Sequence, residues 1–137
     1  MNEYTYDRIE VGMKEGFSVR ITEEEMTKFL EITKDVNPLH NDEDYARSKG
    51  HKKRVVFGML TAAYLSTLAG VYLPGKYSLI HSVKTKFSGA VYVGDELRIE
   101  GTVVEKNDTF KIIIVKVVMV NQNQEKVCKA EMQIGVI

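Results

Sequence analysis

The chain has 137 residues, of which 44% are hydrophobic and 28% charged, a balance typical of one soluble globular domain with a real core. Lys and Arg total 19, as do Asp and Glu, so no net charge favours nucleic acid or an anionic membrane as a partner. The one cysteine, Cys128, excludes an internal disulfide and a cysteine cluster for zinc, and its apolar neighbours indicate buried packing. The first residues lack the basic and apolar regions of a signal peptide, so we expect a cytoplasmic protein.

The start of the chain predicts a strand and then a helix. Apolar residues alternate with polar ones over residues 17–21, which indicates a short strand. Thr22 and Glu25 have the spacing of a capping box, with Thr22 as the N-cap. The helix that they open should end near Asp35. Beyond it, Asn41 is expected to cap a second short helix, which Gly50 stops.

An uncharged run of apolar character extends from Val55 to Leu73. Its length could span a bilayer, but it contains several Gly, Ser and Thr residues. The rest of the chain has the pattern of an amphipathic sheet, and a helix that is apolar all round is also expected where a sheet wraps it. We therefore predict a buried helix that begins at Gly58 and ends at Pro74-Gly75.

From Tyr77 onward the apolar residues alternate with period two, which indicates strands. The expected strands lie near residues 78–87, 96–106, 109–120 and 125–136. Turn signals at Gly94-Asp95, Asn107-Asp108 and 121–123 make short connections, so neighbouring strands should be antiparallel. No linker or repeat divides the chain. Residues 1–137 are therefore expected to form a single α+β domain, a curved antiparallel sheet with the long helix against its concave face.

The main functional motif is Asp35-Val36-Asn37-Pro38-Leu39-His40. On a continuous helix Asp35 and His40 would point about 140° apart. Pro38 disfavours the helical conformation at Asn37, so the chain must turn and can bring both side chains to one side. An Asp beside a His suits proton transfer and the orientation of a water near neutral pH. The alternative is a helix end, a turn and a surface histidine without a chemical role.

Further segments extend this motif along the chain. They are Asp42, the pair Tyr45-Ala46, the helix start Gly58-Met59-Leu60, the segment Leu73-Pro74-Gly75, and Phe87 followed by Val91-Tyr92-Val93-Gly94-Asp95. In this order and spacing the sequence resembles the MaoC-like dehydratases, the (R)-specific enoyl-CoA hydratases of the hot-dog fold. The resemblance covers nearly the whole chain and implies a hot-dog sheet wrapped around a central helix.

The resemblance also implies roles for individual residues. Asp35 and His40 correspond to the catalytic pair of the family, and the backbone N–H of Gly58 to a donor that binds the thioester oxygen. Asn37 would order the loop, and Ser66 would hydrogen-bond the region of the catalytic pair. Without the resemblance, Gly58 need only permit a tight turn, and Ser66 need only bond back to a helix carbonyl.

Two positions depart from the family pattern. Phe57 stands where the family usually has the histidine of a His-Gly pair, which leaves a backbone oxyanion donor possible but puts the contacts of that histidine in doubt. Ala90 stands where the family commonly has a proline. A basic run that includes Lys52, Lys53 and Arg54 could contact the phosphates of CoA or an acidic helix of an acyl carrier protein, although a solvated charged loop is the more frequent explanation of such a run.

The resemblance implies a hydratase or dehydratase that adds water reversibly and syn to a trans-2-enoyl thioester, giving an (R)-3-hydroxyacyl thioester. It implies no metal or redox cofactor, a substrate carried on CoA or phosphopantetheine, and a homodimer or higher homo-oligomer with the acyl tunnel at the subunit interface. Two alternatives remain open at this point. One is a hot-dog acyl-CoA thioesterase; the other, which Phe57 keeps open, is a thioester-binding subunit without efficient catalysis.

Overall fold

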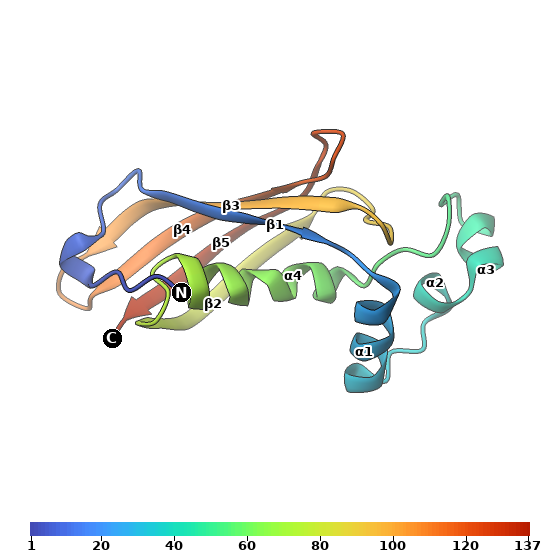
Figure 1. The fold of residues 1–137 in the computed structure, drawn as a ribbon, viewed down its shortest axis with the longest axis horizontal. Helices are drawn as coiled ribbons and strands as arrows, with labels where there is room; N and C mark the ends of the chain where they lie inside the picture. Colours follow the sequence, from blue (N-terminus) through green and yellow to red (C-terminus); the bar gives the residue numbers. More distant parts are fainter.

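The computed structural model describes all residues, Met1–Ile137, and shows one antiparallel sheet with a helix along one face (Figure 1). The strand order is β1-β3-β4-β5-β2. The strands are β1 (Lys14–Arg20), β2 (Ser78–Phe87), β3 (Glu96–Asn107), β4 (Ile112–Val120) and β5 (Lys126–Val136). The helices are η1 (Tyr6–Arg8), α1 (Glu23–Thr33), α2 (Pro38–Asn41), α3 (Glu43–Ser48), α4 (Gly58–Thr67) and the π-helical turn η2 (Leu68–Tyr72).

The predicted α+β architecture is confirmed, and so are the four strands of the second half. Only the start of β4 differs clearly, at residue 112 instead of 109. The turn before it is wider than the sequence indicated, because the side chain of Asn107 accepts a hydrogen bond from the N–H of Phe110 at 3.0 Å. Lys111 then adopts a left-handed conformation with φ of 52°, so pairing resumes only after it.

The capping box that opens α1 is also confirmed. The hydroxyl of Thr22 accepts from the N–H of Glu25 at 3.2 Å, and the carboxylate of Glu25 accepts from the N–H of Thr22 at 2.7 Å. The helix ends at Lys34, which has a φ of 59°. This left-handed residue turns the chain away from the helix axis directly before Asp35.

The prediction that Asn41 caps a helix is wrong. Asn37 caps α2 by accepting from the N–H of Leu39 at 2.9 Å, and Asp42 caps α3 by accepting from the N–H of Tyr45, also at 2.9 Å. The reason is Pro38, whose fixed φ suits the first position of a helix and whose missing N–H costs nothing there. A helical turn therefore begins at Pro38, and Asn41 becomes its last residue.

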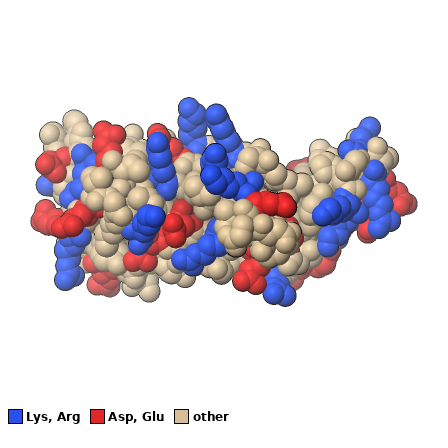
Figure 2. All heavy atoms as spheres, turned by 90° about the horizontal axis from the view of Figure 1, so that it is seen from above, with Lys and Arg blue, Asp and Glu red and all other residues tan.

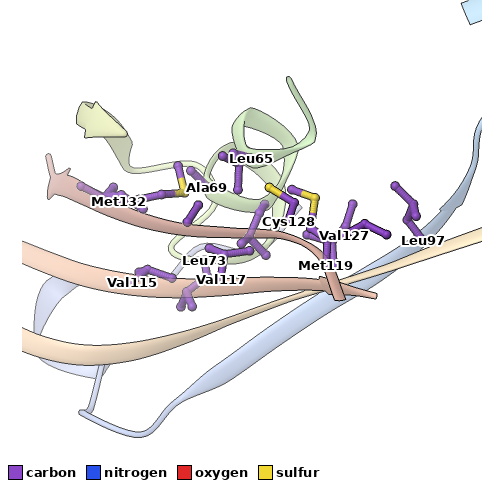
Figure 3. Close-up of a cluster of buried hydrophobic side chains, with 14 of the residues drawn as sticks. Leu65, Ala69, Leu73, Leu97, Val115, Val117, Met119, Val127, Cys128 and Met132 are labelled. Carbon is purple, nitrogen blue, oxygen red and sulfur yellow. The ribbon is translucent and has the colours of Figure 1, made fainter. Parts of the chain in front are cut away.

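The predicted buried helix is α4, continued by η2 to the turn at Leu73-Pro74. It lies along the concave face of the sheet (Figure 1), and no helix of the structure has the length and apolar character needed to cross a membrane. Figure 3 shows Leu65 and Ala69 of the helical segment facing the sheet that carries Val117 and Met132, and all four belong to one core cluster of 24 buried residues. Cys128 belongs to this cluster, as expected, and burial raises the pKa of its thiol.

The contact between η2 and the sheet depends on Gly101 in β3. A Cβ at this position would lie 2.8 Å from Cδ2 of Leu68 and 2.9 Å from Cγ1 of Val115. Leu68 is fully buried, and Val115 is stiff about χ1, so neither can move aside easily. We expect Gly101→Ala to lower the free energy of unfolding by about 1–3 kcal/mol, as overpacked cores do, measured by urea denaturation.

Gly70 in η2 provides the matched control. A Cβ there would lie 3.9 Å from the hydroxyl oxygen of Ser78, which is an ordinary contact. Gly70→Ala should therefore leave stability unchanged or raise it by about 0.5–1 kcal/mol through the usual helix preference for Ala. Equal losses in the two variants would contradict the close approach at Gly101.

Candidate active site

The loop between α1 and α2 is held by the side-chain amide of Asn41, a residue that was expected to cap a helix instead. Nδ2 of Asn41 donates to the carbonyl oxygens of Asp35 at 3.2 Å and Asn37 at 2.9 Å. One carboxylate oxygen of Asp35 accepts from the N–H of Asn37 at 3.1 Å, which leaves its other oxygen available. The sequence does contain a signal for this contact, because Asn41 follows Asn37 by four residues, which is the spacing of one helical turn.

His40 is oriented by a hydrogen bond from outside its own helix. Its Nδ1 lies 2.8 Å from the carbonyl oxygen of Val55. A carbonyl oxygen can only accept, so in the neutral ring Nδ1 carries the proton and Nε2 carries a free lone pair. The segment that supplies the carbonyl is itself fixed, because the N–H of Val55 donates to the carbonyl of Leu39 and that of Val56 donates to Val91.

Phe57 packs against the flat side of this imidazole. The ring centres of His40 and Phe57 lie 4.4 Å apart, and Phe29 of α1 lies 5.0 Å from Phe57 on another side. Phe57 is buried and belongs to the main core. The residue that departs from the family pattern therefore serves as a hydrophobic support for His40, and it leaves Nε2 free.

Two adjoining cavities meet at this point. A cavity of about 360 Å³ is lined by Phe29, Thr33, Asp35, His40, Phe57, Gly58, Met59 and Phe87. A second cavity of about 210 Å³ shares His40, Gly58 and Phe87 with the first. The remaining residues that line this second cavity are Val55, Val56, Thr61, Gly89, Ala90, Val91 and Val127. Asp35, His40 and Gly58 come from three different segments, and the fold places all three around one space.

Gly58 is the first residue of α4, where backbone donors lack partners within the helix. The carbonyl of Phe57 accepts from the N–H groups of Leu60 and Thr61. The N–H of Gly58 itself donates to no acceptor within the protein, and it lies at the end of the helix where the dipole is positive. A Cβ on Gly58 would lie 3.4 Å from the ring of Phe87, so the absence of a side chain keeps this edge of the cavity open.

Ser66 is not brought to this site within a single chain. It is exposed on α4 and lines neither cavity. The basic run is only partly free: Nζ of Lys53 donates to the carbonyl of Val93 at 2.9 Å, and Arg54 pairs with Glu23. Figure 2 shows basic and acidic side chains mixed at the helical end of the molecule, so no field of one sign covers it.

Another depression, of about 310 Å³, lies on the sheet among four lysines, Lys84, Lys86, Lys116 and Lys129. Glu131 and three small apolar residues complete its lining. It contains no histidine, so its carboxylate, that of Glu131, has no imidazole beside it. Acid–base chemistry therefore points to the cavities around His40 and not to this surface.

Comparisons with known proteins agree with this geometry. The sequence model of a family described as "MaoC like domain" matches residues 8–125. The (R)-specific enoyl-CoA hydratase of Aeromonas caviae is 38% identical over 92 residues, which are 67% of this chain and 69% of that protein. The enzyme of the same name from Rhodospirillum rubrum is 32% identical over 98 residues, 72% of this chain and 68% of its own.

Solved structures give the same result. An unliganded R-hydratase from Pseudomonas aeruginosa superimposes with a TM-score of 0.89 and 30% identity, over 96% of this chain and 84% of the other. The (R)-hydratase of A. caviae involved in PHA biosynthesis also gives 0.89 and 30%, over 94% and 98%. The antiparallel sheet with its central helix is therefore a fold that these hydratases share.

The orientation of His40 can be tested directly. We expect the neutral ring to carry its proton on Nδ1, because that atom donates to Val55, and long-range ¹H–¹⁵N NMR distinguishes the two tautomers. His51→Gln and His81→Gln would assign the signals, since the chain has three histidines. A neutral His40 with its proton on Nε2 would contradict the arrangement described above.

Proposed function

The chain belongs to the MaoC-like domain family, and from this membership and the cavity around His40 we propose that it is an acyl-thioester hydratase. The reaction adds water reversibly across the double bond of a trans-2-enoyl thioester and gives an (R)-3-hydroxyacyl thioester. The observation that carries this proposal is that Asp35, His40 and Gly58, a proton-transfer pair and a backbone donor, line one cavity. The substrate is an enoyl group on CoA or on protein-bound phosphopantetheine.

The first step requires a water held over C3 of the substrate. Asp35 can accept a hydrogen bond from this water through its free carboxylate oxygen, and Nε2 of His40 can take a proton from it. The water oxygen forms a bond to C3 as the C2–C3 double bond breaks, and negative charge moves onto the thioester oxygen. Delivery of one proton from the same pair to C2 completes the addition on one face.

The charge on the thioester oxygen needs a partner in the transition state. The N–H of Gly58 is free, lies at the positive end of α4 and borders the cavity. Such a donor, fixed before the reaction begins, typically stabilises the transition state by ~3–4 kcal/mol. Asn37 contributes indirectly, because it caps α2 and accepts from Asn41, which fixes the loop that carries Asp35.

This assignment is tested by loss of enoyl absorbance with crotonyl-CoA and with a longer trans-2-enoyl-CoA. We expect Asp35→Asn and His40→Ala each to lower kcat/KM by ~10²–10⁴-fold, the contribution typical of a placed proton-transfer group. Asp44→Asn and His51→Ala are the controls, because these side chains lie outside the cavities. Hydration that persists at the wild-type rate in either site variant would refute the proposed pair.

Tight binding of the CoA ester without turnover by the wild type would refute CoA hydratase activity. The same assay with an enoyl group on an acyl carrier protein would then separate a carrier-specific hydratase from a binding subunit. Among Lys52, Lys53 and Arg54, only Lys52 has a side chain with neither a hydrogen bond nor an ion pair. Lys52 is therefore the residue of the basic run whose side chain is free to contact the phosphates of a carrier.

We further propose a homodimer formed through the free edge of β2. This strand pairs only with β5, and its exposed side chains include Leu79, Ile80, Val83 and Phe87. A long apolar edge of this kind is normally covered by another strand. An antiparallel strand can pair with its own copy about a two-fold axis, which would join two five-stranded sheets.

The neighbouring side of α4 supports the same interface. Met59, Ala63 and Ser66 are exposed and follow one another at helical spacing, so they form one stripe. The helix is apolar on all sides, and the sheet covers only the opposite part of it. A second subunit would cover this stripe together with the rim of the cavity at Met59 and Phe87, which would place Ser66 in the interface.

The dimer is tested by light scattering after gel filtration. We expect the wild type at twice the chain mass of 15.6 kDa, and Val83→Glu at the monomer mass, because two copies of a new carboxylate would meet near the axis. Val104→Glu is the matched control: Val104 is 38% exposed and Val83 44%, but Val104 lies within β3, away from the free edge. A dimer that survives Val83→Glu would contradict the proposed interface.

A further inference from the structure

Thr61 carries the only buried side-chain oxygen or nitrogen in the structure without a hydrogen-bond partner. The residue is 2% exposed. A buried hydroxyl without a partner loses its hydration and gains nothing in return, so such groups are rare in native proteins. A threonine in a helix usually avoids this by bonding back to a carbonyl one turn earlier, and Thr61 makes no such bond. Its unpaired state therefore points to a ligand.

The position of Thr61 indicates which ligand group that is. Thr61 lines the cavity of about 210 Å³ together with His40 and Gly58. It follows Gly58 by three residues in α4, so the two positions are neighbours on one face of the helix. Side chains on a helix tilt toward its N-terminus, which directs the side chain of Thr61 toward the free N–H of Gly58.

We propose that the hydroxyl of Thr61 is a second hydrogen-bond donor to the thioester oxygen, acting together with the N–H of Gly58. The proposal rests on the hydratase function proposed above and adds a residue to it. Threonine occupies two χ1 rotamers in helices, so the hydroxyl can turn toward an oxygen that arrives beside Gly58. No covalent step is involved, because the group only stabilises charge that develops on the oxygen.

The chemistry of the second cavity favours this role over a purely structural one. Apart from His40 and Thr61, its lining side chains are aliphatic or aromatic, and two positions are glycine. A ligand oxygen that enters this apolar space has few donors to meet, so a hydroxyl beside Gly58 is worth more than it would be in water. The hydroxyl of Thr61, unpaired within the protein, is then free to donate to a substrate oxygen in this cavity.

The test replaces the hydroxyl without changing the shape of the side chain. We expect Thr61→Val to lower kcat by ~10²–10³-fold in the hydration of crotonyl-CoA, the loss typical of one oxyanion donor, and Thr61→Ser to retain most of the activity. The melting temperature of Thr61→Val should be equal to or higher than that of the wild type, since an unpaired buried hydroxyl is removed. Thr67→Val, also in α4 but outside both cavities, is the matched control and should keep wild-type kcat.

A spectroscopic measurement separates donation from packing. Infrared difference spectra of bound butyryl-CoA with a ¹³C-labelled carbonyl should show a lowered C=O stretching frequency in the wild type and in Thr61→Ser. The frequency should rise toward its value in water-free solvent in Thr61→Val. An unchanged carbonyl frequency in Thr61→Val overturns the proposal, whether or not its activity falls, and so does wild-type kcat in that variant.

The two proposals fail in different ways. Butyryl-CoA cannot be hydrated, so the carbonyl frequency reports on Thr61 even if the wild type shows no hydratase activity. An inactive wild type with a Thr61-dependent frequency would refute the hydratase function and retain the donor. An active wild type with a frequency independent of Thr61 would retain the hydratase and refute the donor.

Discussion

The burial of α4 in the curved sheet is the constraint on which the rest of the structure depends. This helix is apolar on all sides, so it is stable only when other surfaces cover it. The sheet covers one part, through close contacts such as that of Leu68 over Gly101. Because this packing fixes the helix along its length, it also fixes where its N-terminus lies, and the N-terminus is where Gly58 borders the cavities.

The segment that precedes α4 connects this constraint to the chemistry. Val55 and Val56 are tied by backbone hydrogen bonds to the chain on both sides, at Leu39 and at Val91. The same segment supplies the carbonyl that orients His40 and the ring of Phe57 that packs against it. The histidine is thus positioned by groups on a rigid part of the fold, although His40 itself lies in a helix of only four residues.

The sequence predicted much of this because local patterns decide it. Alternation of apolar residues located the four strands of the second half, and the spacing of Thr22 and Glu25 located α1. The first strand was located less well, since it begins at Lys14 and ends at Arg20 instead of covering residues 17–21. The short helices were predicted less well, since Asn37, Asn41 and Asp42 can all cap a helix and lie within six residues of one another. The choice among them depends on how Pro38 begins α2, which became clear only from the backbone itself.

The candidate site, too, could be predicted from the sequence only in part. Asp35, His40 and Gly58 could be predicted as a group because the motif and the resemblance name them. The carbonyl of Val55 could not, because every residue has a carbonyl and none is marked in the sequence. The contact of Phe29 with Phe57 joins residues far apart in the chain. The separation of Ser66 from the cavities reflects which side of α4 the sheet covers, and a linear pattern does not contain this.

The hydrogen bond between His40 and Val55 has a consequence for isotopes. With Nδ1 committed to a carbonyl, the imidazole has one nitrogen through which a proton can enter or leave on the substrate side. If Nε2 both takes the proton from water and delivers the proton to C2, the two hydrogens of the proposed reaction use the same atom in succession. When proton delivery to C2 is faster than exchange of the Nε2 hydrogen with solvent, an isotope label on that hydrogen passes from the water to the product. Both the oxygen and the hydrogen added to the substrate then come from one water molecule.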